Sequence, residues 1–193
     1  MKDHIIIDPN FTEVPKKGIQ KIFLTHEHED HTNLEKIEEI TRNYVNDKDK
    51  LEIYGPKSVK KEFNLNIKII KKDKRIKLQN LIMEPYPIEC YKSRGCFSYV
   101  ITKGDVKILH TADSNKFSKN LRDLKQQIDF CFIACFKDYF NDYLNFLNEL
   151  FPKITFPYHF NLGDESDAKN LVNFLNENGI ESKYIQIGTE FEF

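Results

Sequence analysis

Residues 25–40 read "THEHEDHTNLEKIEEI" and contain three of the six histidines in the chain. They overlap a short apolar run, residues 21–25, that is typical of a β-strand. From Leu34 onward, apolar residues recur at three- and four-residue steps, which indicates an amphipathic helix. Thr32 followed by Glu35 fits a capping box, so we expect this helix to start at Thr32. The histidines therefore fall on a strand-to-helix turn, a place where ligand sites gather.

Four side chains of this turn have the chemistry of metal ligands. His26 and His28 are two positions apart, so on extended backbone they point the same way and can reach one ion. Asp30 and His31 come one turn later and can reach a neighbouring position. Zinc, iron and manganese all accept imidazole and carboxylate ligands. The alternative interpretation is a polar loop whose histidines are merely exposed.

Composition places the chain among ordinary globular proteins. The length of 193 residues, with 40% hydrophobic and 31% charged residues, predicts a single domain spanning residues 1–193. The net charge of -1 lacks the basic excess of a nucleic-acid-binding protein. The first residues lack the apolar core and cleavage site typical of a signal peptide, and no apolar run approaches the roughly 18 residues needed to cross a membrane. The four cysteines do not resemble a disulfide scaffold, so we expect a cytoplasmic protein without membrane contact.

Short apolar runs alternate with amphipathic stretches along the rest of the chain, which predicts a mixed α/β fold. Lys103-Gly104-Asp105 is expected to form a hairpin turn. Two prolines in residues 81–90 favour an edge strand or an irregular strand there. The predicted strands cover residues 4–8, 21–25, 51–55, 81–90, 97–113, 129–136, 153–159 and 182–188. The predicted helices cover residues 34–44, 118–127, 138–150 and 167–178.

The sequence His26-Glu27-His28-Glu29-Asp30-His31 resembles the HxHxDH signature of the metallo-β-lactamase-fold hydrolases. In that family a strand with an early aspartate precedes the signature, and "IIIDPN", with Asp8, is similar. "LHTADSN" resembles the context of the family's bridging aspartate and nominates Asp113, with Ala112 where glycine is common. "TFPYHF" resembles the strand end that carries the last family histidine and nominates His159. The alternatives are a turn residue at Asp113 and a hydrogen-bonded histidine at the end of a strand at His159.

One departure from the family pattern concerns a further histidine. The family normally supplies one between the signature helix and the bridging aspartate, but this chain has none between His31 and His110. The corresponding stretch, "PIEC", places Cys90 at the ligand position. A thiolate is a good zinc ligand, so Cys90 can complete the site. Alternatively, Cys90 is a core or loop thiol. His110 is a distant substitute that we expect to face the sheet.

The resemblance implies a four-layer αββα sandwich, with metal ions at one sheet edge. It also implies a hydrolase in which two zinc ions, or iron or manganese, activate water as hydroxide for attack on an ester, lactone, thioester or phosphodiester. Asp30 would in addition orient or accept a proton as the catalytic residue. The implied ligands are His26, His28 and Cys90 for one ion, Asp30, His31 and His159 for the other, and Asp113 as the bridge.

The substrate is the least determined expectation. The short chain looks most like the small lactonase-like branch of the family, which favours a small, anionic substrate over nucleic acid. Ribonuclease members usually carry glycine shortly after the signature, where this chain has Asn33 and Leu34. Residues 91–95 can offer a cationic contact or form a solvated turn. Two other readings stay open: a nuclease with a basic groove leading to His26 and His159, and a degenerate protein that binds one ion or none and acts in binding or sensing.

Overall fold

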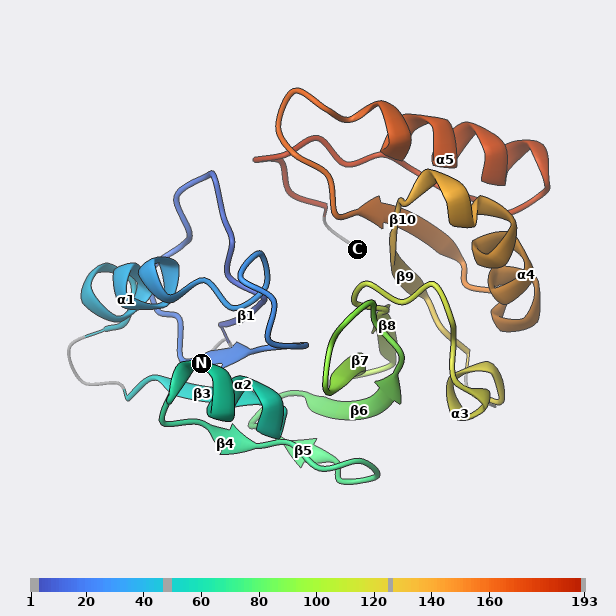
Figure 1. The fold of residues 1–193 in the computed structure, drawn as a ribbon. Helices are drawn as coiled ribbons and strands as arrows, with labels where there is room; N and C mark the ends of the chain where they lie inside the picture. Colours follow the sequence, from blue (N-terminus) through green and yellow to red (C-terminus); the bar gives the residue numbers. More distant parts are fainter. Residues whose placement is uncertain (1–3, 47–49, 125–126, 192–193) are drawn as a thin grey trace.

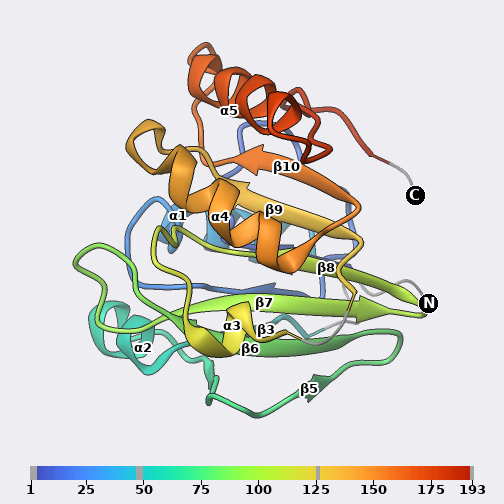
Figure 2. The ribbon, with the colours of Figure 1, turned by 90° about the vertical axis from the view of Figure 1, so that its right-hand side faces the viewer.

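The computed structural model describes residues 4–46, 50–124 and 127–191. Two β-sheets face each other, and helices cover their outer faces, so the chain forms the four layers expected of an αββα sandwich. Figure 1 shows α1 and α2 beside the first sheet, and α4 and α5 beside the far strands of the second. Figure 2 shows α4 lying across β9.

The first sheet is formed by the N-terminal part of the chain and is parallel throughout. Its order is β1 (Ile5–Ile7), β2 (Lys21–Phe23), β3 (Glu52–Gly55) and β4 (Lys68–Ile69). Two helices follow its strands, α1 (Leu34–Asn43) after β2 and α2 (Lys57–Phe63) after β3. Parallel neighbouring strands need a crossover connection, and these helices provide it.

The second sheet is mixed. Its order is β10 (Ile154–Tyr158), β9 (Phe130–Ala134), β8 (Val106–His110), β7 (Cys96–Lys103), β6 (Ile82–Ile88) and β5 (Ile76–Lys77). β6, β7 and β8 are antiparallel neighbours, whereas β8, β9 and β10 are parallel. The carboxyl ends of β6, β8, β9 and β10 therefore lie at one edge. The helices of this half are α3 (Lys119–Arg122), a 3₁₀ turn (Lys137–Tyr139), α4 (Phe140–Leu150) and α5 (Ser166–Glu177).

Side-chain alternation along the strands builds a separate apolar core between each pair of layers. In β2, Ile22 packs under the first two helices together with Ile40, while Phe23 points between the sheets. The Phe23 ring stacks on Tyr54, with ring centres 4.8 Å apart, and contacts Tyr99 of the second sheet edge to face at 5.9 Å. Tyr99 also donates a hydrogen bond to the Leu24 carbonyl at 2.6 Å, which ties the two sheets together.

Several local predictions are confirmed. The hairpin turn between β7 and β8 contains Gly104, whose φ of 59° lies in the left-handed region that glycine adopts without strain. The proline-containing strand β6 lies next to the edge of its sheet, because β5 pairs only with Ile82 and Met83. No helix among residues 4–46, 50–124 and 127–191 is long and apolar enough to cross a membrane.

The start of α1 was predicted wrongly. The helix begins at Leu34, and Asn33 is its N-cap, with a side chain that accepts a hydrogen bond from the Lys36 amide at 3.0 Å. The Thr32 hydroxyl instead donates to the His26 carbonyl at 2.7 Å. The helix therefore begins two residues later than expected, and the Thr32 hydroxyl stabilises the turn that precedes it.

The strand predicted at residues 182–188 is also absent. Ser182 forms an isolated bridge with Thr155, and the backbone pairing ends after the bond from Lys183 to Thr155. Tyr184 then packs on Phe160, with ring centres 5.6 Å apart. The helix predicted at residues 118–127 is confined to Lys119–Arg122, and residues 125 and 126 lie outside the described residues.

Candidate metal centre

The predicted ligand residues all follow the carboxyl ends of strands. His26, His28, Asp30 and His31 occupy the turn after β2, and Cys90 follows β6. Asp113 follows β8 and His159 follows β10 directly. The facing edges of the two sheets thus bring together residues that are far apart in sequence, as parallel strand ends do in α/β folds.

The first cluster consists of His26, His28, Cys90 and Asp113, each of which offers one ligand atom within 4.8 Å of the others. His26 Nε2 lies 3.0 Å from His28 Nδ1, 3.6 Å from Cys90 Sγ and 3.7 Å from Asp113 Oδ2. Cys90 packs against the apolar core, but its sulfur lies beside the histidines of the first cluster. The chemical set of nitrogen, sulfur and oxygen donors is one that zinc accepts.

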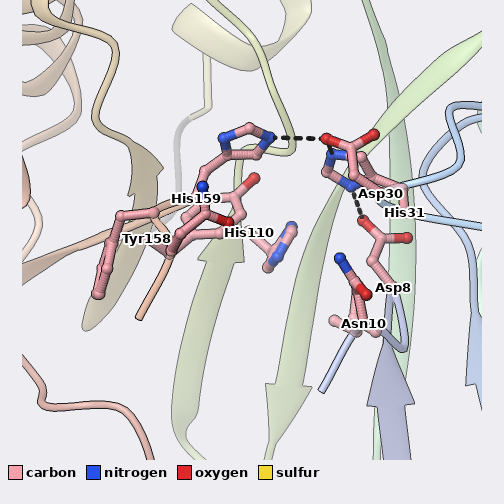
Figure 3. Close-up of a pocket in the computed structure, with 10 residues that line it drawn as sticks. Asp8, Asn10, Asp30, His31, His110, Tyr158 and His159 are labelled. Atoms are coloured by element: carbon pink, nitrogen blue, oxygen red, sulfur yellow. Dashed lines mark hydrogen bonds and ion pairs between the residues drawn. The ribbon is translucent and has the colours of Figure 1, made fainter. Parts of the chain in front are cut away.

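The second cluster consists of Asp30, His31, Asp113 and His159, whose ligand atoms also lie within 4.8 Å of one another. Asp113 Oδ2 lies 2.9 Å from His31 Nε2 and 3.2 Å from His159 Nε2. Asp30 Oδ2 lies 3.3 Å from His159 Nε2, and Figure 3 shows these two side chains facing each other. Asp113 belongs to both clusters, as a bridging carboxylate must.

Two buried atoms of the second cluster indicate that a cation fits there. Asp113 Oδ1 has no hydrogen-bond partner within the described parts of the chain, and His31 Nε2 contacts only the carboxylates of Asp113, at 2.9 Å, and Asp30, at 3.5 Å. His31 is 4% exposed and Asp113 is 9% exposed, so solvent cannot satisfy these atoms freely. Buried polar atoms nearly always have a partner. A divalent cation between the clusters would supply one.

A threonine and an aspartate behind the clusters fix the histidine rings. Asp8 accepts hydrogen bonds from the Thr25 amide at 2.7 Å and from the Thr25 hydroxyl at 2.6 Å. Because that hydroxyl already donates its proton, it accepts from His26 Nδ1 at 2.9 Å. His31 Nδ1 donates to Asp8 Oδ2 at 2.8 Å. Both histidines therefore carry a proton on Nδ1 and present Nε2 to the clusters, an orientation that outer-shell partners commonly enforce on metal ligands.

Backbone conformation is unusual at three positions of the site. Asp8, Ala112 and His159 have φ values of 47°, 48° and 68°, in the left-handed region that L-residues adopt rarely. Ala112 stands where the family commonly has glycine, so it carries the penalty that glycine would avoid. Such conformations cluster at functional sites, where the surrounding structure enforces them.

Glu27, inside the signature, holds the segment that follows Cys90. Its carboxylate accepts hydrogen bonds from the Arg94 amide at 2.6 Å and the Ser93 hydroxyl at 3.1 Å. Burial opposes ionisation of Glu27, but the Arg94 amide and the Ser58 and Ser93 hydroxyls outweigh it and lower its pKa to about 2. The Arg94 guanidinium is paired with Glu27 and Glu62. The cationic side chain of this turn is therefore already engaged.

Charge organises the two clusters. Burial opposes the charges on Asp113 and His31. For Asp113 this effect is outweighed by contacts with His159 and His31, and for His31 by contacts with Asp113 and Asp8. The pKa of Asp113 is held well below its usual range, and that of His31 rises to about 11. The Cys96 thiol, followed by His26, lowers the pKa of Cys90 to about 5 against the effect of burial. Cys90 is therefore a thiolate at neutral pH, the form that binds metals.

A cavity of about 460 Å³ opens beside the second cluster. His110, on β8, lines this cavity, and its ring centre lies 4.6 Å from that of Tyr158. His110 belongs to neither cluster. Figure 3 shows it on the wall between His159 and Asn10.

Sequence reasoning missed Thr25 and Glu27 as supporting residues. Thr25 precedes the signature and Glu27 lies within it, but neither residue type indicates a role by itself. Their partners are Asp8 and residues 93–94, which only the folded chain brings near. A pattern in one segment therefore cannot reveal them.

Comparisons with known proteins agree with this architecture. Residues 6–169 match the model of a family described as the β-lactamase superfamily domain. A protein from Parabacteroides distasonis assigned as a metal-dependent hydrolase aligns with TM-score 0.73 and 21% identity, over 94% of this chain and 84% of that one. Igni18, a metallo hydrolase from Ignicoccus hospitalis, aligns with TM-score 0.75 and 15% identity, over 98% and 91%. A diphosphatase of the PhnP family aligns with TM-score 0.69 and 15% identity, over 92% and 72%.

A search of curated protein sequences finds no match. The structural likenesses, at identities this low, establish the fold. The family model spans most of the chain, and the signature residues that predicted it lie at the facing sheet edges. The chain therefore belongs to the β-lactamase superfamily and has the metallo-β-lactamase fold.

Proposed function

We propose that the protein is a metal-dependent hydrolase whose active site binds two zinc ions at the two clusters. The observation that carries the proposal is the shared position of Asp113, together with its buried Oδ1 atom, which lacks a partner among the described residues. Membership of the superfamily supports the reaction class. Iron and manganese accept the same nitrogen and oxygen donors, but the thiolate of Cys90 favours zinc.

The ligands divide between the two ions according to the clusters. Asp113 would bridge them, because its carboxylate reaches both sets. The first ion would take His26, His28 and Cys90, and the second would take Asp30, His31 and His159.

When bound, two such cations lower the pKa of a water molecule from about 15.7 towards neutrality and stabilise negative charge on the reacting group. The chain's own residues would position that chemistry. Asp8 and Thr25 hold His31 and His26 in place. Asp30 is 53% exposed at the edge of the cavity, and a hydrogen bond from His159 lowers its pKa. Its ionised carboxylate is suited to orient a water molecule and to accept a proton.

The position of Cys90 supports an intact site over a degenerate binding protein. A degenerate site would leave the thiol turned away from the histidines. Cys90 Sγ instead lies 3.6 Å from His26 Nε2, and its lowered pKa, about 5, favours the thiolate. A thiolate in this place can substitute for the histidine that the family normally supplies.

The reacting group of the substrate is proposed to be an ester, lactone, thioester or phosphodiester of a small molecule. Two cations close together attract an anionic group, or one that becomes anionic during the reaction. A phosphorus substrate is compatible with the fold, because one of the similar structures is a diphosphatase. The fold itself does not choose among these classes.

The test is elemental analysis of metal in the purified protein and in variants of Cys90. We expect about two ions per chain in the wild type, a fall towards one in Cys90→Ala and recovery in Cys90→His, because imidazole can replace the thiolate. Cys131→Ala is the matched control, since Cys131 is a buried core thiol outside both clusters. One ion or none in the wild type, unchanged in Cys90→Ala, would contradict the proposal and favour the degenerate protein.

A further inference from the structure

The cavity beside the second cluster continues into a larger cleft. Its second part has a volume of about 620 Å³ and shares Asn10, Tyr158, His159, Phe160 and Asn161 with the first. Clefts of several hundred Å³ hold small-molecule ligands. The second part extends away from the clusters and is further lined by Phe11, Thr12, Glu13, Leu162, Ile187 and Gly188.

No lysine or arginine is among the described residues that line either part of the cleft. Lys36 contacts the outer side of the Phe11 ring at 4.4 Å, but it is paired with Glu39 at 2.9 Å. The carboxylates of Asp8 and Asp30 belong to the metal centre, and Glu13 is exposed at the far end. An anionic group in the outer part of the cleft, beyond His159, would therefore meet the Glu13 carboxylate and no lysine or arginine, which is unfavourable for a second phosphate.

Apart from the residues of the metal centre and Glu13, the polar side chains of the cleft are uncharged. His110 Nδ1 accepts a hydrogen bond from the Ala112 amide at 3.3 Å, so its proton lies on Nε2. Burial lowers the pKa of His110 to about 4, which keeps the ring neutral at pH 7. Asn10 and Asn161 add neutral amides. Groups of this kind bind carbonyl or hydroxyl oxygens.

One group of apolar side chains lines the outer part of the cleft. Phe11, Phe160 and Ile187 are accompanied by Leu162, which is 64% exposed. A large apolar side chain with this exposure at the rim of a cleft leaves surface that an apolar ligand group can cover. Such coverage contributes about 25 cal/mol per Å² of apolar area removed from water.

From these observations we infer that the cleft binds an uncharged, mainly apolar chain of the substrate, attached to the carbonyl or phosphoryl group at the metal centre. The inference rests on the proposed function and narrows its substrate class. Esters, lactones and thioesters of neutral acyl groups fit the cleft, and oligonucleotides do not.

Two substrates that differ in one terminal group test the inference. In 4-nitrophenyl pentanoate the acyl chain ends in a methyl group, whereas in mono-4-nitrophenyl glutarate a carboxylate takes its place. We expect kcat/KM to be about tenfold lower for the glutarate, and to rise from acetate to pentanoate by about two- to fourfold per methylene. An equal or higher kcat/KM for the glutarate would overturn the inference.

A pair of lysine variants assigns the preference to the cleft. Leu162→Lys places a cation on the cleft rim, so the ratio of glutarate to pentanoate turnover should rise about tenfold. Phe151→Lys is the matched control, because Phe151 is 68% exposed and does not line the cleft. Equal ratios in the two variants would contradict the assignment.

Binding of the corresponding amides separates this inference from the proposed function, because amides resist hydrolysis. Calorimetric titration of N-(4-nitrophenyl)pentanamide and of its glutarate analogue needs no turnover. If the esters are not hydrolysed but the neutral amide binds about fivefold more tightly, and Leu162→Lys reverses that order, the hydrolase proposal fails while the cleft assignment stands. If the charged amide binds as well as the neutral one, the cleft assignment fails whatever the activity.

Discussion

Asp8 accepts a hydrogen bond from His31 Nδ1 at 2.8 Å, across the gap between the end of β1 and the start of the helical turn. The same carboxylate is held by two bonds from Thr25. The orientation of a candidate metal ligand therefore depends on a residue that contacts no ion itself.

Asp8→Asn should weaken metal binding by about 10- to 100-fold, because an amide does not support the imidazole as a carboxylate does. Asparagine tolerates the left-handed backbone at this position, so the variant removes the charge and one acceptor oxygen without straining the main chain. Chelator competition measures the affinity. Asp142→Asn, an exposed change on α4, is the control. Equal affinities for the two variants would contradict a supporting role for Asp8.

Thr25→Val should lower the free energy of unfolding by about 1–3 kcal/mol, because Asp8 and His26 each lose a buried hydrogen-bond partner. Thr25→Ser keeps the hydroxyl and should retain both stability and metal content. Urea unfolding with and without chelator gives the stability, and elemental analysis gives the metal content. If the serine variant were as impaired as the valine variant, the methyl group and not the hydroxyl would be responsible.

Glu27→Ala should release the segment after Cys90, because the Arg94 amide and the Ser93 hydroxyl lose their acceptor. We expect hydrogen exchange at the Arg94 amide to become about 10- to 100-fold faster, which corresponds to about 1–3 kcal/mol of lost protection. Glu62→Ala is the matched control, since Glu62 pairs only with the Arg94 guanidinium at the surface. Unchanged exchange in Glu27→Ala would show that the turn holds itself in place.

Asp129 provides a pH-dependent contribution far from the metal centre. It accepts a hydrogen bond from the Lys107 amide at 2.7 Å and pairs with Lys153 at 2.6 Å, and the Lys153 contact lowers its pKa. A carboxylate with a lowered pKa in the folded state stabilises the protein above its unfolded pKa of about 3.9. That contribution is lost as pH falls through the folded pKa.

Asp129→Asn should therefore lower the free energy of unfolding by about 1 kcal/mol at pH 7, with the difference shrinking below about pH 4. Urea unfolding in the presence of chelator, at pH 7, 5 and 3.5, separates this effect from metal loss. A difference that stays constant across this pH range would show that the charge of Asp129 contributes nothing.

The layers of the fold were predictable because the signature resembles that of one family, and the helical period after Leu34 and the short apolar runs are compatible with the fold of that family. The cap of α1 was not. Thr32 and Asn33 are both good capping residues, and only the folded backbone, in which Asn33 accepts from the Lys36 amide, decides between them. In the same way, residues 182–188 have the composition of a strand, but the backbone pairing with β10 ends at Thr155.

Some residues of the candidate site could be predicted from the sequence, and others could not. The turn residues His26 to His31 could be found from their spacing, and Asp113 and His159 from their short contexts. Cys90 could be placed only by the family pattern, because nothing in its own neighbourhood indicates the contact with His26. The roles of Thr25 and Glu27 depend on hydrogen bonds to distant segments, which no local pattern contains.

The two clusters draw on both sheets and on widely separated parts of the chain. Asp30 and His31 come from the first sheet, while Asp113 and His159 come from the second. All four cysteines are free, so no covalent bond joins these parts. An ion bound at the second cluster would close a long loop between the two halves. The unfolded chain would then have less conformational entropy, which favours the folded state. Metal occupancy would then set how cooperatively the two sheets unfold, in addition to supplying the chemistry.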